Sequence, residues 1–350
     1  MKKIIVVGDA LVSSETLEDA AYQLDLDEPV EVKRFEWYSN LQKEQFQEKI
    51  LQIETGGSEA VDIPEGILEE IPTADYLLVH IAPISEEMIQ AAEKLKFIGT
   101  CRGGLEHIHL EACDRKQIPV IHVIRNAEPV ADFTLGLMLA ETRNIARSHH
   151  YIKQGKWVKA FANDPYKKTL SQHTVGLLGL GYIGKLVLKR LNGLGVNVIA
   201  YDPYVDAEKL KREDLRAKLV GLEDLFRQSD ILSIHARLTD ETENLVNKSY
   251  LQLMKPSSYI INSARAGLVN REDLLNVLKE GAIAGAALDV AWTEPLEEND
   301  DFLSLENVTM TSHIAGDTVD AIPRSPYLLR DVLNDYLKKG MSDMLVNLKE

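Results

Sequence analysis

Short apolar runs alternate with segments of helical periodicity in the first third of the chain. The predicted strands cover residues 3–7, 76–81, 97–100 and 120–123, and a helical pattern covers residues 86–95. Residues 54–66, which contain two adjacent glycines and a proline, are predicted to form a surface loop. Because strands that alternate with helices are typical of a parallel sheet with helices on its faces, this part is predicted to form an α/β unit.

A second alternating series begins near residue 174. Six strand candidates cover residues 174–178, 196–201, 231–235, 259–262, 284–289 and 308–311, and helical patterns cover residues 185–194, 222–226 and 272–279. This number of strands with helices between them is typical of a doubly wound domain. The last thirty residues hold an amphipathic helix at 328–337 and a short apolar run at 344–346.

A long helix is predicted between the two series. It opens with Pro129, runs to about His149, and is apolar nearly all round from Phe133 to Leu139. In a soluble chain, such a helix is packed on every side, either between domains or across a subunit interface. We therefore predict a homodimer that forms through the 129–150 helix region.

Composition and charge narrow the function classes. A length of 350 residues favours two domains, and 39 basic against 55 acidic residues give a net charge of −16. A field of that sign repels nucleic acid and anionic membrane surfaces, so we expect neither as a partner. The first apolar run is broken at Gly8, too early for a signal peptide or membrane span. Only two cysteines occur, which favours a reducing, cytoplasmic location.

A glycine loop opens the second series, directly after the predicted strand at 174–178. Gly179, Gly181 and Gly184 form a G-x-G-x-x-G pattern before a predicted helix. In this pattern the first glycine makes a tight turn, the second lets the backbone approach a pyrophosphate, and the third lets helix and strand pack closely. The next strand ends at Asp202, which is 202 − 179 = 23 residues from the first glycine. An acid at about this spacing binds ribose hydroxyls and favours NAD over NADP.

Three later segments place polar residues where predicted strands end, the edge at which open α/β sheets bind ligands. Arg265, Glu294 and His313 are their chemically useful members. Arg265 suits bidentate binding of a carboxylate, and His313 suits exchange of a hydroxyl proton during hydride transfer. Glu294, bonded to the second imidazole nitrogen, would fix the histidine tautomer.

These motifs, in this order after the glycine loop, resemble those of the D-isomer-specific 2-hydroxyacid dehydrogenase family, in its phosphoglycerate dehydrogenase-like branch, and the resemblance covers essentially the whole chain. It implies a Rossmann-type doubly wound NAD-binding domain at 124–320, inserted into a smaller, flavodoxin-like α/β substrate domain at 1–123 plus 321–350, with the substrate between them. It also implies that Arg265, Glu294 and His313 are catalytic. The cofactor-binding residues that it implies are Gly179, Gly181, Tyr182, Ile183, Gly184, Asp202, Ser263, Ala264, Arg265, Asp289, His313, Ala315 and Gly316, with Asp289 near the nicotinamide amide.

On the substrate side, the resemblance implies that Arg102, Gly103, Gly104, Asn126 and Arg265 bind the substrate. Arg102 is a local cation beside two glycines whose amides can approach an anion; the alternative is an ordinary solvated charge. The strand end at residues 79–83 lacks the arginine that phosphoglycerate-specific relatives present there, which argues against 3-phosphoglycerate. His80 could substitute for that arginine, but we interpret it as a structural histidine.

The sequence therefore predicts an NAD-dependent oxidoreductase that interconverts a small 2-hydroxy acid and its 2-keto acid. The alternative is a catalytically weak, NAD-sensing binding protein of the corepressor type, because the family also contains such proteins. Formate oxidation is disfavoured, since those relatives carry glutamine where this chain has Glu294. His107 and His109 lack further ligands at metal-site spacing, so we expect no metal.

Overall fold

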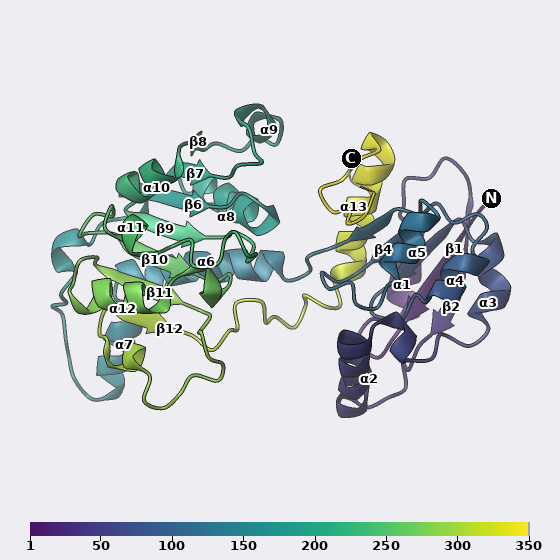
Figure 1. Ribbon diagram of the computed structural model, residues 1–350, viewed down its shortest axis with the longest axis horizontal. Coiled ribbons are helices and arrows are strands. Elements are labelled where there is room, and N and C mark those ends of the chain that lie inside the picture. Colours follow the sequence, from purple (N-terminus) through teal and green to yellow (C-terminus); the bar gives the residue numbers. More distant parts are fainter. Residues whose placement is uncertain (349–350) are drawn as a thin grey trace. The chain divides into compact units, whose positions relative to one another are not determined.

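The chain divides into two α/β units (Figure 1). The computed structural model describes residues 1–348, without the side chains of residues 43 and 209. Unit 1 comprises Met1–Arg125 and Thr318–Glu350, and unit 2 comprises Asn126–Asp317. The inserted domain expected at 124–320 differs from unit 2 by two residues at one end and three at the other. The substrate domain was expected at 1–123 plus 321–350, and its last two residues, 349 and 350, lie outside the described residues.

Unit 1 is built on a five-stranded parallel sheet. Its strands are β1 (Lys2–Gly8), β2 (Val30–Glu36), β3 (Tyr76–Val79), β4 (Phe97–Thr100) and β5 (Val120–His122). Their order is β2-β1-β3-β4-β5, the flavodoxin-like order. The strand β2 was missed by the sequence prediction because this edge strand carries four charged residues among seven, which weakens the apolar signal.

Helices cover both faces of this sheet. They are α1 (Ser14–Tyr22), α2 (Lys43–Gly56), α3 (Ile67–Glu70), α4 (Glu86–Ala91), α5 (Leu110–Arg115) and α13 (Ser325–Lys339). Core residues of α1 and α13 pack on one face of the sheet, and core residues of α2 to α5 pack on the other. The loop predicted at 54–66 is partly wrong, since α2 continues to Gly56 and a 3₁₀ turn follows at Ser58–Ala60.

The C-terminal segment returns to the sheet of unit 1. Leu329 and Leu333 of α13 are buried against β4, and Gly99 makes room for them, since a Cβ there would lie 3.1 Å from Leu329. Beyond α13, Leu345 forms an antiparallel bridge with Ile121. The side chain of Asn347 then accepts a hydrogen bond from Val120 N at 2.7 Å. Residues more than two hundred positions apart thus complete one core.

Unit 2 is built on a seven-stranded parallel sheet. Its strands are β6 (Thr174–Leu178), β7 (Asn197–Tyr201), β8 (Lys218–Leu219), β9 (Ile231–Ile234), β10 (Tyr259–Asn262), β11 (Gly285–Leu288) and β12 (Val308–Met310). Their order is β12-β11-β10-β9-β6-β7-β8, so the direction of winding changes between β6 and β9. This order confirms the predicted doubly wound, Rossmann-type architecture. Six of the strands were predicted, and the two-residue edge strand β8 was missed.

The helices of unit 2 lie on both faces of its sheet (Figure 1). They are α6 (Ala127–Thr142), α7 (Ile145–Lys153), α8 (Tyr182–Gly193), α9 (Ala207–Arg212), α10 (Leu222–Gln228), α11 (Lys248–Leu251) and α12 (Arg271–Lys279). Successive side chains of β10 point to opposite faces, so that Tyr259 and Ile261 join the core beneath α6 and α8 while Ile260 joins the core beneath α10 to α12. None of these helices is long and apolar enough to span a membrane, nor is any other within residues 1–348.

The single helix predicted from Pro129 to His149 is wrong, because the chain breaks it into α6 and α7. Asn144 adopts a left-handed backbone conformation with φ of 56°, which ends the helical path. Its buried side chain donates to Asn163 Oδ1 at 2.7 Å and accepts from Arg147 Nη1 at 2.6 Å. Asparagine tolerates this conformation better than most residues. Because the helical periodicity continues on both sides of Asn144, the sequence pattern did not indicate this break.

A buried carboxylate joins α6 to the far edge of the sheet. Glu141 is fully buried, is paired with Arg147 of α7, and accepts a hydrogen bond from Thr309 Oγ1 of β12 at 2.7 Å. Burial raises the pKa of Glu141 to about 7, although the Arg147 charge opposes this shift. The carboxylate fits only because Gly285 of β11 has no Cβ beside it. α6 is thereby fixed against β11 and β12, whose carboxyl ends lead into the candidate site.

Candidate active site

The glycine loop connects β6 to α8 at the point where the winding of the sheet changes. Gly179 has a φ of 99°, and a Cβ there would lie 2.7 Å from Ala236 N. A Cβ on Gly184 would collide with the carbonyl oxygen of Gly179. By contrast, a Cβ on Gly181 would meet no atom within 4 Å. The fold itself therefore requires Gly179 and Gly184, whereas the glycine at 181 leaves an open approach to the backbone that a dinucleotide pyrophosphate would use.

Asp202 lies beside this loop at the end of β7. Its Oδ2 accepts a hydrogen bond from Leu180 N at 2.7 Å, and its Oδ1 accepts one from Tyr204 N at 2.9 Å. Each carboxylate oxygen retains a lone pair for a further donor, such as a ribose hydroxyl. Together with Tyr182 and Ile183 in the first turn of α8, these groups fit an NAD molecule.

The segment after β10 carries Ser263, Ala264 and Arg265. The buried side chain of Asn262 braces it, accepting from Ala264 N and donating to Arg265 O, both at 3.0 Å. Ser263 Oγ lies 2.6 Å from Thr134 Oγ1 of α6. The Arg265 side chain is exposed, and its Nη1 donates to Ala264 O at 2.7 Å. Asn262 and Thr134 were not predicted as site residues, although a polar residue closing an apolar strand was a usable signal for Asn262.

Asp289 follows β11 and organises the segment after β12. It is 1% exposed, and its Oδ1 accepts from Thr311 Oγ1 at 2.6 Å and from Ile314 N at 3.1 Å. Its Oδ2 accepts from Ala315 N at 2.8 Å. The sequence analysis predicted that Asp289 binds the cofactor, and it did not predict these hydrogen bonds to the segment after β12. Both carboxylate oxygens hold the segment that contains His313.

His313 and Glu294 form a hydrogen-bonded pair. His313 Nδ1 lies 2.8 Å from Glu294 Oε2, and Glu294 Oε1 accepts from Ala291 N at 3.0 Å. The His313 hydrogen bond, then the Ala291 N–H and the nearby Arg265 charge, lower the pKa of Glu294 below its usual range. Because the ionised carboxylate only accepts hydrogen bonds, the proton of the imidazole lies on Nδ1 and Nε2 remains available as a base.

The backbone of His313 adds a second constraint. Its φ is 55°, a left-handed conformation that is uncommon for a residue with a side chain. Such conformations persist where the surroundings enforce them, and they cluster at functional sites. Here the Asp289 hydrogen bonds enforce it. The imidazole is nearly half exposed, with a side-chain exposure of 46%, so a small molecule can reach it.

The predicted substrate residues lie in two different environments. Asn126 precedes α6, and its Nδ2 would lie 3.0 Å from a Cβ on Gly316, which places it against the 313–316 segment. Arg102 instead donates from Nη2 to Glu54 Oε1 at 3.0 Å and lies 3.8 Å from Glu106. Its side chain is only 12% exposed and covers Gly104. Glu54 of α2 therefore compensates the charge of Arg102, and substrate binding by Arg102 stays a prediction.

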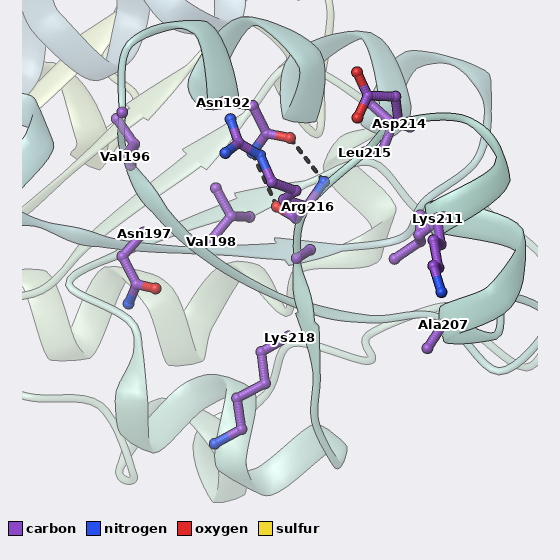
Figure 2. A pocket seen from close by; sticks show the side chains of 13 residues that line it. Asn192, Val196, Asn197, Val198, Ala207, Lys211, Asp214, Leu215, Arg216 and Lys218 are labelled. Carbon is purple, nitrogen blue, oxygen red and sulfur yellow. Dashed lines mark hydrogen bonds between the residues drawn. The ribbon is translucent and has the colours of Figure 1, made fainter.

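A cavity of about 610 Å³ lies at the other end of the unit 2 sheet (Figure 2). It surrounds the start of β7 and includes the cationic side chains of Lys211, Arg216 and Lys218. The Asn192 side chain bonds both the N–H and the carbonyl oxygen of Arg216, at 2.8 and 2.9 Å. Since the glycine loop and Asp202 are at the carboxyl ends of the strands, this cavity is separate from the candidate site.

The comparisons with known proteins agree on one protein family. Residues 135–315, just over half of the chain, match the family model described as D-isomer specific 2-hydroxyacid dehydrogenase, NAD binding domain. The chain is 39% identical over 295 residues to a glyoxylate reductase from Thermofilum pendens, covering 81% of this chain and 84% of that protein.

Two further similarities extend this picture. The chain is 36% identical over 289 residues to a D-3-phosphoglycerate dehydrogenase from Methanocaldococcus jannaschii, covering 81% of this chain but only 54% of that protein, so it spans about half the length of this relative. Among solved structures, a D-isomer specific 2-hydroxyacid dehydrogenase from Lactobacillus delbrueckii ssp. bulgaricus, in an NAD complexed form, has a TM-score of 0.67 at 22% identity and covers 99% of this chain and 100% of that one. At this identity the likeness shows the shared fold.

The open space at Gly181 leads to a prediction about cofactor affinity. We expect Gly181→Ala to fold normally but to raise the dissociation constant of NADH by about tenfold or more, since a methyl group would occupy the pyrophosphate approach. Fluorescence titration with NADH measures this constant. Gly193→Ala is the matched control, because a Cβ there also meets nothing within 4 Å, but at the opposite end of α8. Equal affinities in the two variants would contradict the assignment.

Proposed function

Because the chain belongs to the D-isomer specific 2-hydroxyacid dehydrogenase family, we propose that it is an NAD-dependent oxidoreductase that interconverts a small D-2-hydroxy acid and its 2-keto acid. The observation that carries the proposal is the His313–Glu294 hydrogen bond, which leaves imidazole Nε2 available as an acid–base group, with the charge of Arg265 close enough to Glu294 to lower the pKa of that carboxyl. The matched region is the NAD-binding domain of the family, and the glycine loop and Asp202 suit that cofactor.

Arg265, His313 and Glu294 have different roles in the proposed reaction. Arg265 binds the C1 carboxylate of the substrate with its planar guanidinium and polarises the neighbouring oxygen at C2. His313 Nε2 takes the hydroxyl proton when a hydroxy acid is oxidised and returns it to the carbonyl oxygen in the reverse direction. Glu294 stabilises the imidazolium that results. NAD, when bound at the glycine loop, would supply the hydride acceptor, so the substrate would lose one hydride from C2 to the cofactor and one hydroxyl proton to His313 Nε2.

Cofactor choice follows from Asp202. Its carboxylate is anchored by two backbone N–H groups and carries a negative charge where an adenosine ribose would bind. That charge favours two ribose hydroxyls and repels the 2′-phosphate of NADP. NAD is accordingly the cofactor in this proposal.

A homodimer through the region of α6 and α7 is also part of the proposal. No residue of α7 is buried in the single chain, and Ile145, Ile152 and Trp157 are 57%, 46% and 79% exposed. Exposed apolar side chains gathered along one segment are typical of a protein interface.

Sedimentation velocity at micromolar concentration should show a dimer, and the double variant Ile145→Glu with Ile152→Glu should shift the equilibrium toward monomer. A wild-type monomer would contradict this part.

A cytoplasmic location is proposed on the state of the two cysteines. Cys101 and Cys113 are both buried and free. Burial raises the pKa of the Cys113 thiol to about 12, as expected for a packed thiol rather than a nucleophile. Two buried free thiols suit a reducing compartment.

The enzymatic proposal is tested by assaying a panel of 2-keto acids with NADH. We expect reduction of at least one keto acid, and a loss on the order of 100- to 10,000-fold in kcat for His313→Ala, because the proton donor is removed. The NADH dissociation constant should change little in this variant. Tight NADH binding without reduction of any keto acid would instead support the NAD-sensing corepressor alternative.

The pH dependence of turnover tests the role of Glu294. Its pKa is lowered, so the carboxylate is ionised throughout the range from pH 5 to 9 and stabilises protonated His313. Glu294→Gln removes this charge while keeping the hydrogen-bonding shape. For keto acid reduction, which needs a protonated imidazole, the alkaline limb of the kcat/KM profile should move to lower pH. An unchanged profile would remove Glu294 from this role.

A further inference from the structure

A second loop lies beside the glycine loop where the winding of the unit 2 sheet changes. It comprises residues 235–239 and follows β9, the neighbour of β6 in the sheet. A Cβ on Gly179 would lie 2.7 Å from Ala236 N, and a Cβ on Gly184 would lie 3.4 Å from His235 Cβ. In open α/β sheets, ligands bind outside the carboxyl ends of the strands at this point. The 235–239 loop therefore borders the position proposed for the dinucleotide.

Hydrogen bonds and packing fix the path of this loop. Thr242 Oγ1 donates to the carbonyl oxygen of Arg237 at 2.6 Å and accepts from Thr239 N at 2.8 Å. A Cβ on Gly267 would lie 3.1 Å from Leu238, so the loop also packs against the segment after β10. The backbone of Arg237 is thus fixed between one residue that packs on the glycine loop and another that packs on the segment after β10.

The charge of Arg237 is not balanced by an acidic side chain. The Arg237 side chain is exposed, and within residues 1–348 it forms no ion pair and no hydrogen bond. Asp240, Glu241 and Glu243 follow in the same connection, but none of them pairs with it. A hydrogen bond from the Thr239 hydroxyl instead lowers the pKa of Glu241. Arg237 is therefore a cation that an anionic ligand can pair with at the switch point.

Two other basic side chains close to the glycine loop do not fill this role. Lys185, the first cation after the loop, pairs with Glu213 at 2.7 Å. His235 Nε2 lies 2.9 Å from Ser233 Oγ, and burial lowers the pKa of His235 to about 4, so this imidazole is neutral at pH 7. Backbone N–H groups and the N-terminus of α8 attract a pyrophosphate without neutralising its full charge. A guanidinium on the neighbouring loop supplies the missing countercharge.

We propose that Arg237 is a cofactor-binding residue that contacts the pyrophosphate of NAD across the switch point from the glycine loop. The inference rests on the proposed function, and it adds a residue that was not predicted from the sequence. The strand order β9-β6-β7 places the glycine loop between Arg237 and Asp202. Asp202 suits the ribose on the β7 side, so the pyrophosphate at the glycine loop is the anion next to Arg237. The N–H donors of a guanidinium match phosphate oxygens.

Fluorescence titration with NADH tests this role. We expect Arg237→Met to raise the dissociation constant of NADH by about tenfold or more at an ionic strength of about 0.01 M, since a charge-assisted contact is lost. Arg237→Lys should retain part of the affinity, because it keeps the charge without the fork of donors. Thermal unfolding should be unchanged in both variants, because the exposed side chain forms no ion pair within the protein.

The salt dependence separates a contact with the pyrophosphate from stacking of the guanidinium on the adenine ring. At an ionic strength of about 1 M, the ratio of the Arg237→Met to the wild-type dissociation constant should fall to about threefold or less, because charges are screened within about 3 Å. Stacking depends less on salt. A ratio that stays the same from low to high salt would overturn the pyrophosphate assignment.

Arg227→Met is the matched control, because Arg227 is an exposed arginine of unit 2 that pairs with Glu223 of the same helix. It should leave the dissociation constant within about twofold of wild type. If the wild type reduces a keto acid and Arg237→Met binds NADH equally well, the inference is wrong while the proposed function stands. If the wild type does not bind NADH, the proposed function fails and this inference fails with it.

Discussion

Both sheets are parallel throughout, and this constraint shapes the rest of the molecule. A parallel strand cannot turn directly into its neighbour, so each one must leave the sheet at its carboxyl end and return through a crossover. The chain therefore exposes a series of strand ends along one edge, and polar side chains can gather there without crossing the apolar cores. Asp202, Arg265, Asp289 and His313 all follow strands of unit 2 in this way, as Asp9 and His80 do in unit 1.

Buried polar side chains then give these strand ends a defined shape. Asp289 uses both carboxylate oxygens to hold the segment of His313, and Asn262 uses its whole amide to hold the segment of Arg265. In unit 1, Asp9 fixes its own loop through two backbone N–H groups while it orients His80. Each group would be costly to bury without these partners. The same hydrogen bonds that satisfy the buried groups therefore place the chemically active ones.

Cationic side chains lie at the carboxyl edges of both sheets, although the net charge of the chain is −16. Arg265 is exposed in unit 2, and Arg125 is half-buried in unit 1 with a histidine as its hydrogen-bond partner. Most other cations are paired with carboxylates, as Arg102 is with Glu54 and Arg147 with Glu141. A strongly acidic chain can thus attract a small anion locally, because the field close to one cation outweighs that of distant, screened charges.

Local patterns in the sequence determined most strands of the two α/β series, the glycine loop and the strand-end residues of unit 2. These depend on periodicity and spacing over short stretches, so they can be predicted from the residues alone. Only the tertiary structure decided that Asn144 divides one predicted helix into α6 and α7. It also decided that Glu54 pairs with Arg102 and that Arg125 forms a hydrogen bond with His80. Those contacts join residues 19 to 48 positions apart. They depend on strand order and on how each helix lies against its sheet, which no local period in the sequence encodes.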